Sequence, residues 1–141
     1  MKTSMNTVLA LAMKEIRTTQ GYNQKAMADL LGMTNAGWGK VENGLTTISV
    51  EMLFRFGKLV NMPPSHILVK VEETIKLLEK EGFEFTAVST DEDSLLQGYS
   101  WSKAVGSGVA RFAALPFKVD VELGIVARAA TLAKNMGKFF K

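Results

Sequence analysis

The sequence predicts a mainly α-helical protein, with five helices in roughly the first eighty residues and a C-terminal extension that is mostly helical. Apolar residues in the first part recur at the three- and four-residue spacing of amphipathic helices. Most of these segments are bounded by residues typical of helix ends, with Asn, Ser or Thr before them and Gly after them. Because 47% of the 141 residues are hydrophobic, the chain can bury one ordinary core.

The first two helices are expected on either side of Gly21. Before this glycine, one face of a helix is apolar and consists of Val8, Leu9, Ala12, Met13 and Ile16. After it, "NQKAMADLLG" (residues 23–32) begins with Asn23, which is suited to an N-cap, and ends with Gly32, a typical C-terminal stop. Its inward residues are expected to be Met27, Ala28 and Leu31.

The third helix is short and contains an unusual pair of glycines. Either Thr34 or Asn35 can cap it, and it continues to about Glu42, where Asn43-Gly44 closes it. The stretch "GWGKVENG" places two glycines inside the helical pattern. Each should cost about 1 kcal/mol relative to alanine, so their presence needs an explanation.

The fourth and fifth helices are separated by "NMPPSH". The fourth begins near Ser49, and its buried side is expected to consist of Leu53, Phe56, Leu59 and Val60. Pro64 suits the first turn of the fifth helix, where its missing N–H loses no hydrogen bond. That helix remains amphipathic as far as Gly82, with an inner face of Ile67, Leu68, Val71, Ile75 and Leu78.

Beyond residue 82 the periodicity is weaker. "FEFTAV" (residues 83–88) alternates apolar and polar positions and predicts a short strand. After Pro116 an amphipathic helix is expected again, with an apolar side of Leu123, Val126, Ala130, Ala133 and Phe140.

Composition argues against several kinds of protein. The chain has no cysteine, so it has neither disulfides nor thiolate metal ligands. The apolar run at residues 8–13 is too short for a signal peptide, and no segment has the roughly 18 apolar residues of a membrane span. His66 is the only histidine, and the acidic clusters are typical of solvated helix faces. We therefore expect a cytoplasmic protein with no membrane span, no catalytic residues, no bound metal and no cofactor.

The net charge of +3 is unevenly distributed along the chain. Residues 1–69 contain seven Lys or Arg and four Asp or Glu, residues 70–100 contain three and eight, and residues 101–141 contain seven and two. Two basic ends therefore flank an acidic middle. This distribution fits the solvated faces of unrelated helices, and it equally fits a basic end that binds a polyanion.

The segment "IRTTQGYNQKAMADLLGMTNAGWGKVENG" resembles the phage-repressor-like (Cro/XRE-type) family of helix-turn-helix transcriptional regulators. The matching elements, in chain order, are Gln24, Ala28, Leu31-Gly32, Thr34 and the signature Glu42-Asn43-Gly44. The resemblance covers about residues 7–69 and implies a five-helix, repressor-like domain that binds double-stranded DNA. We place this DNA-binding domain at residues 1–69, and an extended helix with a dimerisation or partner region at residues 70–141.

The resemblance also implies which residues contact DNA. A recognition helix enters a major groove about 12 Å wide, so its exposed start needs short or polar side chains. The implied base-reading residues are Thr34, Asn35, Ala36, Gly37 and Lys40. The implied phosphate contacts are Gln24, Lys25, Asn43 and Thr46. Arg17 and Glu42 occupy positions that form a salt bridge in some family members, which is a structural role.

Residues 37–39 depart from the family pattern. Trp38 stands where a mid-sized aliphatic residue is usual, and Gly37 and Gly39 replace residues that have a Cβ. One explanation is that the glycines make room for a large indole buried against the first and fourth helices. The other is that they allow the helix to approach DNA closely, or to become ordered only on binding.

These observations favour a transcriptional repressor that binds an inverted repeat as a homodimer, because a single module reads only a few base pairs. Surplus apolar residues after position 70 predict that residues 70–141 provide most of the homodimer contacts. The alternative is a protein-interaction adaptor, whose helix-turn-helix module binds protein and whose basic C-terminal helix lies at a partner or membrane surface. A continuous positive face around Gln24, Lys25, Lys40 and Asn43 would favour the first interpretation.

Overall fold

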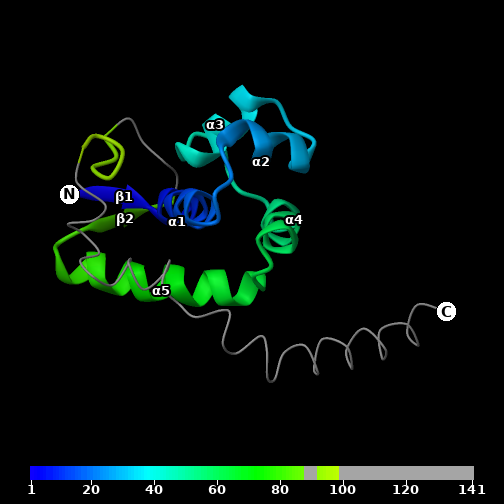
Figure 1. Ribbon diagram of the computed structural model, residues 1–141. Coiled ribbons are helices and arrows are strands. Elements are labelled where there is room, and N and C mark those ends of the chain that lie inside the picture. The colour runs from blue at the N-terminus through cyan, green and yellow to red at the C-terminus, as the bar shows by residue number, and fades with distance from the viewer. Residues whose placement is uncertain (88–91, 99–141) are drawn as a thin grey trace, which may run out of the picture.

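The computed structural model describes residues 1–87 and 92–98, and their secondary structure is mainly helical (Figure 1). The elements in chain order are β1 (Lys2–Ser4), α1 (Met5–Thr19), α2 (Gln24–Leu31), α3 (Asn35–Glu42), α4 (Val50–Val60), α5 (Pro64–Lys80) and β2 (Glu84–Thr86). The five helices expected from the sequence are confirmed. The helix expected after Pro116 lies outside the described residues.

Side-chain caps explain where four of the helices begin. Ser4, Asn23, Thr34 and Ser49 each accept a hydrogen bond from the backbone N–H three residues later. Of the two residues considered for α3, Thr34 is therefore the N-cap. Helix α2 ends at Gly32, whose φ of 68° lies in the left-handed region that favours glycine.

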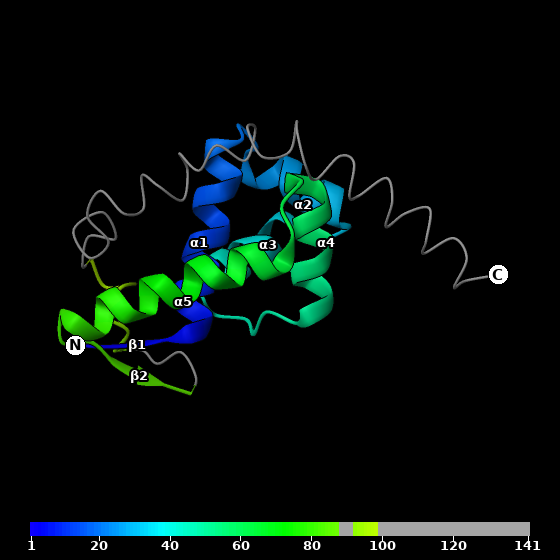
Figure 2. The same cartoon turned by 90° about the horizontal axis from the view of Figure 1, so that it is seen from below.

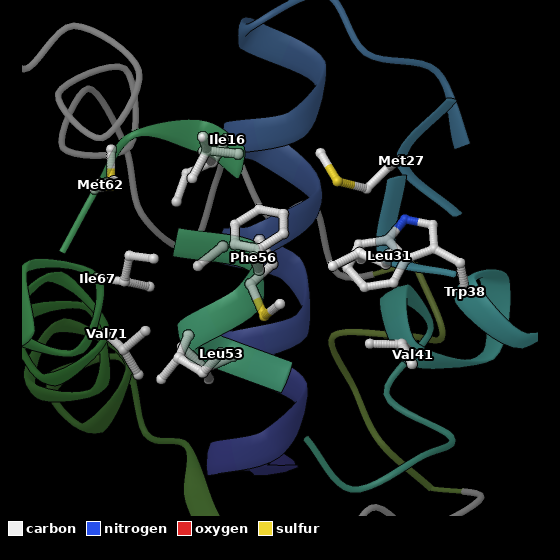
Figure 3. Close-up of a cluster of buried hydrophobic side chains, with 14 of the residues drawn as sticks. Ile16, Met27, Leu31, Trp38, Val41, Leu53, Phe56, Met62, Ile67 and Val71 are labelled. Carbon is white, nitrogen blue, oxygen red and sulfur yellow. The ribbon is translucent and has the colours of Figure 1, made fainter. Parts of the chain in front are cut away.

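The core is one cluster of buried side chains contributed by all five helices and by the segment after α5 (Figure 3). Helix α1 packs against α3 and α5, and α5 lies across α1 (Figure 2). The inner face of α5 consists of Ile67, Val71, Thr74 and Leu78. Leu68, which the periodicity also placed on that face, is 42% exposed, so this part of the prediction is wrong.

A small parallel sheet joins the two ends of the described chain. The predicted strand at residues 83–88 forms β2, and it pairs with β1 in a register that places Thr3 opposite Phe85. The sequence analysis missed β1, because a three-residue strand shows no periodicity. The backbone N–H of Glu84 also donates to the carbonyl of Met1 (2.8 Å), which extends the pairing to the first residue.

The segment after β2 returns to the same place and lies beside β1. Asp93 forms a parallel bridge with Lys2, and its carboxylate is buried. One carboxylate oxygen accepts from the hydroxyls of Thr3 (3.2 Å) and Thr7 (2.7 Å), and the other accepts from the backbone N–H of Leu95 (3.0 Å). The buried acid therefore has a hydrogen-bond donor at each oxygen, as burial requires.

The boundary expected at residue 69 falls inside α5, which is continuous from residue 64 to residue 80. Beyond that boundary, Val71, Leu78, Phe83 and Leu95 are buried in the same cluster as the α1 residues. Residues 71–87 and 92–95 therefore help to complete the core around α1. Over residues 1–87 and 92–98, the helices are too short or too polar to cross a membrane.

Candidate nucleic-acid interface

Helices α2 and α3 are connected by a tight turn at residues 32–34. The turn begins at the left-handed Gly32, and the backbone N–H of Met33 donates to the carbonyl of Ala28 (2.8 Å). Thr34 then starts α3 as its N-cap. The guanidinium of Arg55 donates to the carbonyl of Leu31 (2.6 Å), so α4 holds the end of α2 in place. These bonds fix the orientation of α3 relative to α2.

The buried and exposed sides of α3 are sharply divided. Trp38, Val41 and Glu42 are buried. The residues expected to read bases lie away from them: Thr34, Asn35, Ala36 and Lys40 are exposed, and Gly37 is half-buried. Ala36 and Lys40 are four residues apart and therefore share one side of the helix. The exposed side of α3 thus consists of short and polar residues.

The residues expected to contact phosphate lie at the ends of α2 and α3. Lys25, Asn43 and Thr46 are exposed, whereas Gln24 is half-buried. The side-chain amide of Gln24 donates to Glu42 (2.8 Å), which places the start of α2 beside the end of α3. Gln24 and Asn43 are therefore near each other.

Glu42 is the centre of a buried polar cluster that joins α1, α2 and α3. Its carboxylate pairs with the guanidinium of Arg17 through Nε and through Nη2 (3.2 Å). It also accepts from the indole N–H of Trp38 (2.8 Å) and from Gln24. Arg17 in turn donates through Nη1 to the carbonyl of Tyr22 (2.6 Å). The Arg17–Glu42 pair therefore fixes the C-terminal end of α3 against α1. Each carboxylate oxygen of Glu42 accepts at least one hydrogen bond.

The two glycines of α3 lie on either side of a buried indole. Trp38 is fully buried as expected, and its ring stacks on Phe56 of α4 at 5.9 Å between ring centres. A Cβ added at Gly39 would meet no described atom within 4 Å outside its chain neighbours and its own helix backbone. One added at Gly37 would meet the hydroxyl of Thr34, the N-cap, at 2.9 Å. Other elements therefore do not require a glycine at position 39, and the explanation that the glycines leave room for the indole stays a prediction.

Sequence reasoning missed Asn6, which holds the loop between α3 and α4. Its amide oxygen accepts from the backbone N–H of Ile48 (2.9 Å), and its amide nitrogen donates to the carbonyls of Thr46 (3.1 Å) and Gly44 (3.5 Å). No local pattern could reveal these bonds, because the partners are about forty residues apart in the chain.

Comparison with known proteins agrees with this geometry. A family model described as helix-turn-helix matches residues 13–67. Residues 13–67 form a Cro/XRE-type helix-turn-helix domain. The matched range covers the C-terminal part of α1, all of α2, α3 and α4, and the start of α5. In this domain α3 occupies the position of the recognition helix.

A relative is found in Bacillus subtilis (strain 168): the uncharacterised HTH-type transcriptional regulator YonR, derived from the SPbeta prophage. It is 27% identical over 88 residues, which are 62% of this chain and 74% of the relative. No solved structure matches the chain significantly. The similarity to YonR extends beyond the length of the helix-turn-helix domain, since that domain has only 55 residues.

Proposed function

We propose that the protein is a cytoplasmic, sequence-specific DNA-binding transcriptional regulator, and that it represses transcription from an inverted-repeat operator as a homodimer. The observation that supports this function is the exposed side of α3. In a helix-turn-helix domain this side faces the major groove, and here it presents only short and polar residues. The name of the prophage relative, a transcriptional regulator, points the same way.

Within the proposed interface, Asn35 and Lys40 supply the hydrogen-bonding groups that distinguish bases. An asparagine amide pairs with adenine, a lysine ammonium favours guanine, and the methyl group of Ala36 suits the methyl of thymine. Thr34 and Gly37 complete the base-reading side at the start of the helix. A single module with so few readers specifies a short half-site, so two modules about one helical turn (~34 Å) apart would be needed.

The phosphate contacts proposed for Gln24, Lys25, Asn43 and Thr46 position the domain without reading sequence. Charged contacts release counterions from DNA, and Lys25 is the charged residue of this set. A dimer that reaches about six charged contacts with further Lys or Arg residues should lose on the order of a thousandfold in affinity between ~50 and ~200 mM salt. Lys25 is the better residue for a test than Gln24. The side chain of Gln24 also bonds to the buried Glu42, so its removal would disturb the fold.

Selection of binding sites from a pool of random DNA duplexes tests the proposal. The wild-type chain should enrich an inverted repeat, and Lys40→Ala and Asn35→Ala should each lose discrimination at one base position by roughly 1–3 kcal/mol. Lys25→Ala should weaken binding to all duplexes evenly.

If no duplex binds even at low salt, the protein-interaction adaptor becomes the better interpretation. If the selected profiles of the first two variants stay unchanged, the base-reading assignment is wrong. A reporter gene placed behind the selected operator should be expressed less when the protein is present.

The proposed homodimer needs an interface outside α3. We place it on residues 70–141, whose described part exposes the apolar side chains of Leu77 and Leu96 at 40% and 36%. Helix α4 offers a competing surface, where Val50 and Phe54 are 73% and 59% exposed. Light scattering on the full chain decides between them. Leu77→Glu should give monomers and Val50→Glu should leave the dimer intact, and the reverse result would move the interface to α4.

A further inference from the structure

The loop between α3 and α4, residues 43–49, includes two of the proposed phosphate contacts, Asn43 and Thr46. Its first half is held by α3 itself. The backbone N–H of Leu45 donates to the carbonyl of Lys40 (2.9 Å), and Gly44 adopts a left-handed φ of 69°. Thr46 and Thr47 follow on the surface and are exposed. The second half of the loop therefore needs a partner outside α3 to keep one conformation.

That partner is the first turn of α1. Figure 2 shows the connection from α3 to α4 passing close to the start of α1, and the hydrogen bonds of Asn6 span it. The side chain accepts from Ile48 and donates to Thr46 and Gly44, so a single amide fixes backbone groups over five residues of the loop. Only a group with adjacent donor and acceptor atoms can form this set, and a primary amide has both.

Asn6 is itself held firmly. It lies two residues after Ser4, the buried N-cap of α1, and next to the buried Thr7. Thr7 donates to the buried carboxylate of Asp93 on the other side of the turn. The half-buried Asn6 thus projects from a backbone that is anchored before and after it. A rigid support of this kind can fix the loop before any ligand is bound.

We propose that Asn6 is a positioning residue for DNA binding: it fixes the α3–α4 loop so that Asn43 and Thr46 face the phosphate backbone. The inference rests on the proposed DNA-binding function. Asn6 acts through the loop and need not touch DNA. A loop that is already ordered loses less conformational freedom when DNA binds. Removal of the Asn6 side chain should therefore lower the affinity for every duplex. Because phosphate contacts hold no sequence information, the preferred site should stay the same.

Two variants of Asn6 and one neighbour test the proposal in the full chain. Asn6→Ala removes all three bonds, and Asn6→Asp keeps the acceptor for Ile48 but loses the donor to Thr46 and Gly44. Met5→Ala is the matched control, since Met5 lies in the same turn and is 60% exposed. Far-UV circular dichroism first shows that each variant is folded.

Amide hydrogen exchange at Ile48 and duplex binding at several salt concentrations are then measured. Asn6→Ala should exchange faster at Ile48 and should bind the selected duplex and a random duplex about tenfold more weakly. The salt slope should stay the same, because Asn43 and Thr46 are uncharged and release no counterions. Asn6→Asp should bind at least as weakly as Asn6→Ala, because its carboxylate faces the two loop carbonyl oxygens and adds a negative charge near the proposed phosphate contacts. Met5→Ala should keep both the exchange rate and the affinity within about twofold.

Three results would overturn the proposal. The first is unchanged exchange at Ile48 in Asn6→Ala, which would show that the loop is held without the amide. The second is faster exchange with unchanged duplex affinity, which would leave Asn6 a purely structural residue while the proposed DNA-binding function stands. The third is a wild-type chain that binds no duplex at any salt concentration, which would end the proposed function and this role of Asn6 together.

Discussion

Gly39→Ala should make the protein more stable, although it alters the proposed DNA-binding helix. Gly39 lies inside α3 in an ordinary helical conformation, and its added Cβ would meet open space within the part of the chain that the structure describes. Alanine exceeds glycine in helix propensity by about 0.8–1.0 kcal/mol, and no contact is lost. We therefore expect the free energy of unfolding to rise by about 0.5–1 kcal/mol.

Gly57→Ala is the matched control, because the same change in α4 should have the opposite sign. A Cβ at Gly57 would lie 2.6 Å from the carbonyl oxygen of Met62 and 3.3 Å from the ring of Pro64. The backbone that turns from α4 to α5 would have to move, and insertions into a packed site typically cost about 1–3 kcal/mol. The helix-propensity gain of alanine offsets only part of this cost.

Urea denaturation followed by far-UV circular dichroism measures both variants against the wild type. A lower free energy of unfolding for Gly39→Ala would show that packing does constrain this position, and would refute our reasoning. DNA binding by the same variant then tests the other explanation for the glycine. If α3 approaches the duplex closely, the more stable variant should bind DNA more weakly than the wild type, and equal binding would leave close approach without support.

Four further substitutions, at three positions, probe the buried groups. Glu42→Ala leaves the buried guanidinium of Arg17 without its carboxylate and should lower the free energy of unfolding by about 3–5 kcal/mol in urea; a loss below about 1 kcal/mol would contradict the buried pair. Trp38→Ala should cost about 3–5 kcal/mol as a large core truncation, whereas Trp38→Phe, which keeps a ring but loses the indole hydrogen bond, should cost clearly less in the same assay. Asp93→Ala should cost about 1–3 kcal/mol by removing the acceptor of Thr7, and an unchanged unfolding midpoint would show that the segment after β2 adds no stability.

The helices were predictable because their signals are local. Asn23 and Ser49 are caps recognised by residue type, and the apolar spacing that precedes Gly32 fixes the inward side of α2. Leu68 shows the limit of that spacing. It lies beside the inner face of α5, and only the actual position of α1 decides which neighbouring apolar residue is covered.

The strand β1 could not be predicted, because its structure comes from a partner more than eighty residues away. A segment of three residues has no periodicity of its own, and only pairing with Glu84–Thr86 and Asp93 makes it a strand. The same reason hid Asn6. Its amide resembles any polar residue in a first helical turn until the loop at residues 44–48 is placed beside it.

The proposed interface shows the same division between local and distant causes. Helical spacing alone separates the exposed Ala36 and Lys40 from the buried Trp38. The pairing of Arg17 with Glu42 came from family resemblance and not from spacing, because the two residues lie on different helices. The surroundings of the glycines could not be predicted for a related reason. Which atoms of other elements surround a missing Cβ depends on the packing of the whole domain, and around Gly39 none of them lies within 4 Å among the described residues.

The first turn of α1 connects the two parts expected from the sequence, residues 1–69 and residues 70–141. On one side, Asn6 bonds to the loop that follows the recognition helix. On the other side, the adjacent Thr7 bonds to Asp93, which lies beyond α5 and β2. Removal of the residues after position 69 would therefore take away both most of α5 and the buried acceptor at the base of α1. DNA affinity and oligomeric state must be compared in full-length variants, because a shortened chain would change the support of the proposed interface as well as the dimer surface.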